Sequence, residues 1–248
     1  MPAETDILKL ESVTKSFAGV TAVHHVTITL MPREIRALIG PNGAGKTTLF
    51  NLITGDLPLD GGRIFFEGAE ITGLPPYRIS QRNISRTFQI TSIFPRMSVV
   101  ENVQAALFSK RGRTFDPLSR ARGMDLDRTM ELLETVGLSD QSHKISGSLA
   151  LGDQKLLELA IALATEPTLL LLDEPTAGMA LHERIEFVKL ITRIVEEKQL
   201  TVFFIEHDMD IVFSIAQRIN VIHQGRIIAE GDPSSIRANP EVQGVYLG

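Results

Sequence analysis

The stretch that decides the fold is Gly40-Pro-Asn-Gly-Ala-Gly-Lys-Thr-Thr48, which joins an apolar run ending at Ile39 to residues 46–54, whose apolar positions have helical spacing. Two glycines five residues apart, followed by Lys and Thr, form the phosphate-loop pattern. Glycines let backbone N–H groups turn toward phosphate oxygens, and the next helix directs the positive end of its dipole there. We therefore expect a strand, a phosphate-binding loop and a helix, rather than a simple glycine-rich turn.

A nucleotide site built on this loop needs charge as well as backbone donors. Lys46 supplies a point charge for the phosphates, and the hydroxyl of Thr47 is a ligand for Mg²⁺. The residues expected to bind the nucleotide here are Gly40, Pro41, Asn42, Gly43, Ala44, Gly45, Lys46, Thr47 and Thr48.

A second signal is the run Leu169-Leu-Leu-Leu-Asp-Glu174, a buried apolar strand that ends in two carboxylates. The carboxyl ends of strands are where α/β sheets place their ligands. We expect Asp173 to help hold Mg²⁺ through water, and Glu174 to take a proton from the water that attacks the γ-phosphate. Alone, the acidic pair would more simply begin a loop or cap a helix; the phosphate loop favours the catalytic interpretation.

The rest of the pattern predicts an α/β fold in one domain, residues 1–248. Alternating apolar residues predict an antiparallel β layer before and after the loop, and apolar strands around 169–205 predict a parallel β-α-β core. Helical periodicity dominates between them. We predict a catalytic core with its β layer at 1–88 and 167–248, an inserted α-helical subdomain at 89–166, and a strand, turn, strand and short helix at the C-terminal end.

Composition excludes several classes of protein. The chain has no cysteine, so a disulfide framework, a thiol nucleophile and a Cys-ligated metal are excluded. Its net charge of −5 argues against broad nucleic-acid binding. The first residues lack the basic and apolar regions of a signal peptide, and the apolar stretches are far shorter than the roughly 18 residues that span a membrane. We expect a chain that does not itself cross a membrane.

The order of these motifs resembles the ATP-binding cassette (ABC) ATPases over essentially the whole chain. The resemblance implies a P-loop NTPase fold with a RecA-like core. It also implies that Gln89, in Arg-Thr-Phe-Gln, senses Mg²⁺ and the attacking water, that His207 is the switch histidine and that Phe17 stacks on adenine. Singly, each would be an ordinary surface or core residue. The catalytic residues implied are Glu174, His207, Gln89 and Lys46, and the metal-binding residues are Thr47, Gln89 and Asp173.

The segment in the place of the family signature departs from the commonest form, Leu-Ser-Gly-Gly-Gln. Ala150 stands at the serine position and Leu151 at the first glycine, while Gly152 keeps the expected glycine. In the family this segment binds the γ-phosphate held by the opposite subunit, so the departure concerns the partner's site. Ala180 departs too, where many relatives have a polar or acidic residue. The signature residues are Leu149, Ala150, Leu151, Gly152, Asp153 and Gln154.

Within the family, the combination of Arg-Thr-Phe-Gln, Leu-Ala-Leu-Gly-Asp-Gln and the final Val-Tyr-Leu-Gly resembles the ATPase subunits of bacterial branched-chain amino acid importers. This implies ATP and Mg²⁺ as cofactors, a second ATPase subunit, identical or not, integral membrane permease subunits and, indirectly, a solute-binding protein outside the membrane. It implies no nucleic acid, and a peripheral place on the cytoplasmic face of the inner membrane. Residues 90–97 should line the groove for a helix of the permease, with Ile93 and Phe94 as exposed contacts; packing within the helical subdomain is the alternative.

Other functions have less support from the sequence. The ATPase of a lipopolysaccharide-export system is the alternative within the family, although its signature usually keeps the Ser and Gly replaced here by Ala150 and Leu151. ABC-type proteins that act on DNA need long heptad arms, and those that act on the ribosome usually carry two cassettes; the sequence has neither. The presence of Glu174 and His207 argues against a nucleotide-binding regulator that does not hydrolyse ATP.

Overall fold

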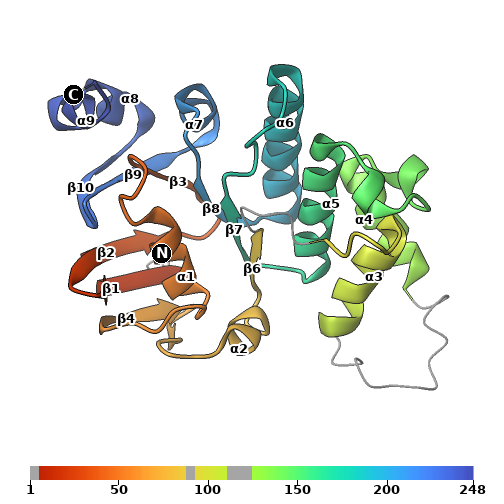
Figure 1. The fold of residues 1–248 in the computed structure, drawn as a ribbon, viewed down its shortest axis with the longest axis horizontal. Helices are drawn as coiled ribbons and strands as arrows, with labels where there is room; N and C mark the ends of the chain where they lie inside the picture. The colour runs from red at the N-terminus through yellow and green to blue at the C-terminus, as the bar shows by residue number, and fades with distance from the viewer. Residues whose placement is uncertain (1–5, 88–92, 111–124, 248) are drawn as a thin grey trace, which may run out of the picture.

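The computed structural model of the chain describes residues 6–87, 93–110 and 125–247, and a six-stranded sheet runs through its centre (Figure 1). The strand order is β10-β9-β3-β8-β7-β6, and every neighbouring pair except β9–β10 is parallel. All residues of β3, β7 and β8 are buried, as near-continuous apolar runs predict for strands covered on both faces. The strands are β3 (Ile35–Ile39), β6 (Ile84–Thr87), β7 (Leu169–Asp173), β8 (Thr201–Ile205), β9 (Arg218–His223) and β10 (Arg226–Gly231).

A second, antiparallel sheet forms a layer beside this core, with strand order β2-β1-β4-β5. One hydrophobic cluster joins the layer, helix α1 and the core sheet, and it contains Leu10, Phe50 and Phe203. The rings of Phe50 on α1 and Phe203 on β8 lie 5.2 Å apart. The helix after the phosphate loop is therefore held between two sheets. The elements are β1 (Leu8–Phe17), β2 (Val20–Leu30), α1 (Lys46–Ile53), β4 (Gly61–Phe66) and β5 (Ala69–Glu70).

Helices between β6 and β7 form the part of the molecule on the right of Figure 1. α3, α4 and α5 pack against one another, and α5 also contacts β6. As predicted, α4 ends at Gly137, whose φ of 78° suits glycine. The predicted single C-terminal helix is wrong: Pro240 lacks an N–H and restricts Asn239, so two short helices form. The helices are α2 (Pro76–Ser80), α3 (Val99–Lys110), α4 (Leu126–Val136), α5 (Leu151–Ala164), α6 (Leu181–Lys198), α7 (Met209–Ile215), α8 (Pro233–Ala238) and α9 (Pro240–Leu247), with 3₁₀ turns at Ser139–Gln141 and Ser146–Ser148.

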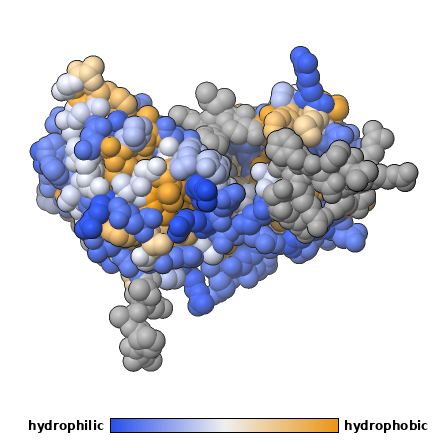
Figure 2. Space-filling model, turned by 90° about the horizontal axis from the view of Figure 1, so that it is seen from below, coloured by the Kyte–Doolittle hydropathy of each residue, from blue (hydrophilic) through white to orange (hydrophobic). Residues whose placement is uncertain are grey.

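The surface is mixed in polarity. Figure 2 shows small apolar patches among hydrophilic side chains, mainly over the left part of the molecule, and a hydrophilic band along the bottom of the view. Within the described residues, no helix is both long and apolar enough to pass through a bilayer.

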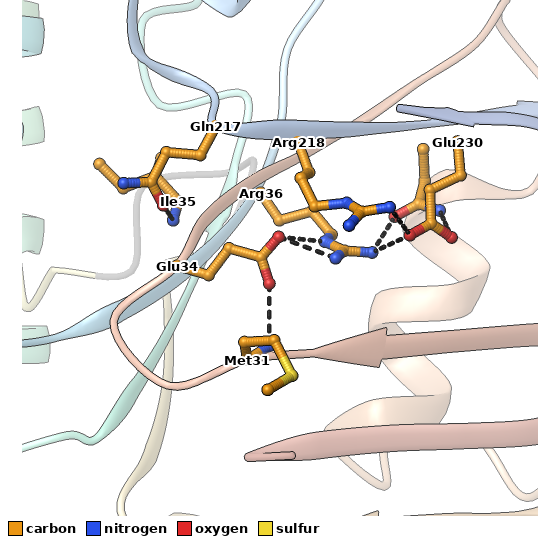
Figure 3. Close-up of polar contacts among 8 residues, drawn as sticks. Met31, Glu34, Ile35, Arg36, Gln217, Arg218 and Glu230 are labelled. Carbon is orange, nitrogen blue, oxygen red and sulfur yellow. Dashed lines mark hydrogen bonds and ion pairs between the residues drawn. The ribbon is translucent and has the colours of Figure 1, made fainter. Parts of the chain in front are cut away.

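A buried arginine fastens the C-terminal hairpin to the core sheet (Figure 3). Arg36 on β3 is 1% exposed, and it donates to Glu34 Oε1 at 2.7 Å, to Asn220 Oδ1 at 3.1 Å and to Glu230 Oε1 at 3.1 Å. Arg218 pairs with the same Glu230 oxygen at 3.0 Å. These contacts tie β9 and β10 to β3, the strand that leads into the phosphate loop.

Replacing Arg36 by methionine is expected to destabilise the protein by about 3–5 kcal/mol, because the buried Glu34 carboxylate would lose its cation. The free energy of unfolding from chemical denaturation measures this. Arg218→Met is the matched control: its side chain is 52% exposed, so a loss of about 1 kcal/mol or less is expected. Equal losses in the two variants would contradict the assigned role of Arg36.

Candidate nucleotide-binding site

The phosphate loop connects β3 to α1, as the sequence predicted, and two of its glycines are required by close backbone neighbours. A Cβ atom on Gly40 would lie 2.1 Å from the carbonyl oxygen of Ile222, and one on Gly45 would lie 2.2 Å from that of Ala22. Gly45 also has a φ of 105°, which side chains rarely adopt. The loop therefore fits its surroundings only with glycine at both positions.

Lys46 is the first residue of α1, and its side chain turns back into the loop. Its Nζ donates to the carbonyl oxygens of Gly40 at 2.7 Å and Pro41 at 3.0 Å. Burial lowers the pKa of the Lys46 ammonium, while the nearby charges of Glu174 and Asp173 act in the opposite direction. Thr47 and Thr48 follow in the first helical turn, both half-buried, and Asn42 and Gly43 are exposed at the tip of the loop. The ammonium thus lies where the loop and the two carboxylates meet.

Asp173 and Glu174 lie where β7 ends, next to the end of β8. Asp173 is fully buried, and its Oδ2 accepts a hydrogen bond of 2.8 Å from Arg86 Nη2. Burial raises the pKa of the Asp173 carboxyl, against the opposing effect of Arg86. The backbone N–H of Glu174 donates to the carbonyl of Ile205 at 3.0 Å. The carboxylates are held by neighbouring strands rather than by a flexible loop.

His207 meets Glu174, although the two residues are far apart in the sequence. His207 Nε2 lies 2.9 Å from Glu174 Oε1. Glu174 follows β7 and His207 follows β8, and these strands pair in parallel, with Asp173 opposite Ile205. The contact is therefore a direct result of the strand register.

The remaining predicted site residues do not all lie at the phosphate loop. Phe17, the last residue of β1, is 43% exposed and pairs with Val20 on β2. Ala22, two residues after Val20, lies against Gly45, so the end of this hairpin is near the loop. Gln89 lies outside the described residues, two positions after the end of β6. Of the two interpretations of residues 93–94, an exposed contact fits Phe94, which is 57% exposed, and packing fits Ile93, which is partly buried against a hydrophobic cluster that joins α3, α4 and α5 to the core sheet.

The signature segment lies at the start of α5. Ala150 occupies the N-cap position, where its side chain has no oxygen to cap the helix, and Leu151 is exposed. Gly152 is buried against Glu183 of α6: a Cβ on Gly152 would lie 3.0 Å from Glu183 Oε1. The other signature side chains turn toward their own subdomain, Asp153 Oδ2 accepting from Gln141 Nε2 at 2.9 Å and Gln154 Nε2 donating to the carbonyl of Leu149 at 3.0 Å. Among the residues that the structure describes, no side chain caps the first turn of α5.

Two residues of this region were not singled out from the sequence. Arg86 belongs to the Arg-Thr-Phe-Gln motif, but nothing in the motif indicates that it reaches Asp173. Glu183 accepts a hydrogen bond of 2.8 Å from the backbone N–H of Ala180, and its spacing three residues after the N-cap was the available signal.

Sequence profiles of known families match two parts of the chain. The ABC transporter family matches residues 23–177, and a family described as branched-chain amino acid ATP-binding cassette transporters matches residues 226–248. The first match covers the phosphate loop, and the second begins at β10 and continues through α8 and α9.

Known proteins and structures are similar over nearly the whole length. The high-affinity branched-chain amino acid transport ATP-binding protein LivG of Escherichia coli K12 is 40% identical, with 98% of each chain covered. The lipopolysaccharide export ATP-binding protein LptB of Haemophilus influenzae is 34% identical over 98% of this chain and 97% of its own. An ABC-transporter ATP-binding cassette in its ADP conformation superposes with a TM-score of 0.87 at 31% identity, covering 98% of this chain and 99% of that chain. The predicted fold class is confirmed.

Proposed function

The chain belongs to the ABC transporter family of ATP-hydrolysing subunits, and we propose that it powers the uptake of branched-chain amino acids or related small solutes through separate membrane subunits. The observation that carries the solute class is the match of residues 226–248 to the branched-chain amino acid family, together with 40% identity to LivG. The lipopolysaccharide-export alternative has less support, since LptB is more distant at 34% identity.

ATP binding is assigned to the loop and to the end of the first hairpin. Backbone N–H groups of the phosphate loop and the Lys46 ammonium bind the phosphates, at the positive end of the α1 dipole. The exposed ring of Phe17 is available to stack on adenine.

Mg²⁺ fits the residues present. Among the residues that the structure describes, Asp173 Oδ1 has no hydrogen-bond partner, although it is buried. Mg²⁺ prefers oxygen ligands and usually takes one or two protein groups together with waters and phosphates. Thr47 and Asp173 would hold the ion, which would neutralise charge on the β- and γ-phosphates. Gln89 remains a predicted sensor of the same ion.

Hydrolysis requires a base for the attacking water, and Glu174 supplies it. As the water oxygen attacks the γ-phosphorus, Glu174 accepts the proton, and the bond to the β-phosphate oxygen breaks to leave ADP and phosphate. The 2.9 Å contact with His207 orients the carboxylate. Lys46 stabilises the negative charge that the phosphate oxygens carry in the transition state.

The signature is proposed to act on the ATP of a second subunit. In a head-to-tail pair, each ATP would lie between the phosphate loop of one subunit and the start of α5 in the other. Ala150 and Leu151 offer no polar side chain, so backbone N–H groups supply the contact.

The membrane partner is proposed to dock beside residues 93–97, with Phe94 as the exposed apolar contact. Such docking places the chain on the cytoplasmic face of the membrane as a peripheral subunit. The ATPase does not touch the solute, which a separate solute-binding protein delivers.

Glu174→Gln is expected to leave ATP binding intact and to lower turnover by a factor of about a hundred to ten thousand, because a positioned base is lost. Lys46→Ala should instead weaken ATP binding itself, by about tenfold or more, through loss of a charged phosphate contact. Steady-state hydrolysis by the assembled complex and ATP affinity of the subunit are the measurements. Glu197→Gln, at an exposed position of α6, is the matched control and should change neither. Near-normal turnover of Glu174→Gln would refute its role as the base.

Ala150→Ser is expected to change hydrolysis by no more than about tenfold, since one neutral hydrogen bond contributes roughly 0.5–1.5 kcal/mol. Gly152→Asp should nearly abolish hydrolysis, because it puts a carboxylate beside Glu183 at the start of α5. Gly152→Asn, with a similar shape and no charge, separates repulsion from crowding and should retain more activity than Gly152→Asp. Indifference of the assembled complex to all three changes would show that the signature is idle.

A further inference from the structure

Arg86 is a buried side chain that the mechanism above does not use. It lies on β6, three residues before Gln89, and its side chain is 5% exposed. β6 is the edge strand of the core sheet and pairs in parallel with β7, which carries Asp173 (Figure 1). The guanidinium lies 5.7 Å from the centre of the Phe50 ring, so it is packed under α1 as well.

Its two terminal nitrogens reach two different parts of the nucleotide site. Nη2 donates to Asp173 Oδ2 at 2.8 Å, and Nη1 donates to Asn51 Oδ1 at 2.6 Å. Asn51 belongs to α1, the helix that begins with Lys46 and Thr47. Nη1 also lies near Thr54 and Asp56, with the Asp56 carboxylate at 3.5 Å. One planar group therefore connects the helix after the phosphate loop to the carboxylate after β7.

The Asp173 carboxylate is used asymmetrically as a result. Its Oδ2 is held by Arg86, and its Oδ1 is buried without a hydrogen-bond partner in the described part of the chain. A charge-assisted hydrogen bond to one carboxylate oxygen restricts rotation of the group and so fixes the direction of the other oxygen. The planar fork of arginine holds two acceptors at a fixed separation, which a lysine ammonium does not reproduce.

We propose that Arg86 is a positioning residue for Mg²⁺: by anchoring Asp173 Oδ2 to Asn51 of α1, it keeps Oδ1 directed to the ion that Thr47 of the same helix also meets. This inference rests on the proposed function. If Arg86 only balanced the charge of the buried Asp173 carboxylate, its contact with Asn51 would not be required; the proposal therefore gives Arg86 a positioning role as well.

The test is Arg86→Lys in the full-length chain, which keeps the positive charge and removes the fork. The probe is a fluorescent ATP analogue, titrated in EDTA and at increasing MgCl₂. We expect the Mg²⁺ concentration that produces half of the Mg²⁺-dependent increase in affinity for the analogue to be about tenfold higher than in the unmodified chain. An effect of this size is usual when a residue that orients a metal ligand is lost. Affinity in EDTA should stay within about twofold, since the phosphate loop is unchanged.

Arg36→Lys is the matched control, because Arg36 is another arginine with a buried, carboxylate-paired side chain, and its hydrogen bonds within the described residues go to Glu34, Asn220 and Glu230. It should leave the Mg²⁺ dependence unchanged. Asn51→Ala keeps all charges and removes the other anchor of the fork, so the half-saturating Mg²⁺ concentration should rise by about threefold, the effect of one hydrogen bond. This second variant keeps the proposal testable if Arg86→Lys fails to fold.

Three results would overturn the proposal. The first is an unchanged Mg²⁺ dependence in Arg86→Lys or Asn51→Ala. The second is an equal shift in Arg36→Lys, which would indicate general destabilisation. The third is an equal loss of affinity in EDTA, which would place the effect on the phosphate loop. Absence of Mg²⁺-dependent binding by the unmodified chain would instead refute the proposed function.

Discussion

The site depends on one constraint, the parallel register of β3, β8 and β7. Because parallel strands end at the same edge of a sheet, the segments that follow them meet there. The phosphate loop follows β3, Asp173 and Glu174 come at the end of β7, and His207 follows β8. The pairing of Asp173 with Ile205 sets the contact between Glu174 and His207 at 2.9 Å. A shift of one residue in this register would turn the side chains to the opposite face and separate the pair.

The loop itself is also held by the C-terminal hairpin and by β2. The backbone N–H of Gly225, in the turn of the C-terminal hairpin, donates to the carbonyl of Ala44 at 3.0 Å, and Ile222 and Ala22 approach Gly40 and Gly45. The buried network around Arg36 fastens the same hairpin to β3. The turn of the C-terminal hairpin therefore contacts the phosphate loop, whereas the Arg36 network holds the hairpin at the opposite end of β3.

Much of this arrangement could be predicted because its signals are local. The loop sequence around Gly40, the apolar run before Asp173 and the strand before His207 each specify an element and the residue at its end. The rest depends on pairs of residues distant in sequence, such as Arg86 with Asp173 and Gly152 with Glu183, and a single sequence gives no register for these. The sequence left two interpretations of Ile93 open for the same reason, since its partial burial depends on packing against residues elsewhere in the chain.

The proposed function is that ATP hydrolysis at this edge of the sheet drives solute uptake through a membrane partner. It can be tested by uptake of radiolabelled leucine into lipid vesicles that contain the permease subunits and this chain, with ATP on the side of the chain and the solute-binding protein on the other. Leucine is expected to accumulate only with ATP, and its uptake is expected to be competed by other branched-chain amino acids or by the related solute that the binding protein carries. ATP hydrolysis without uptake of any such solute, accompanied by extraction of lipopolysaccharide, would contradict it.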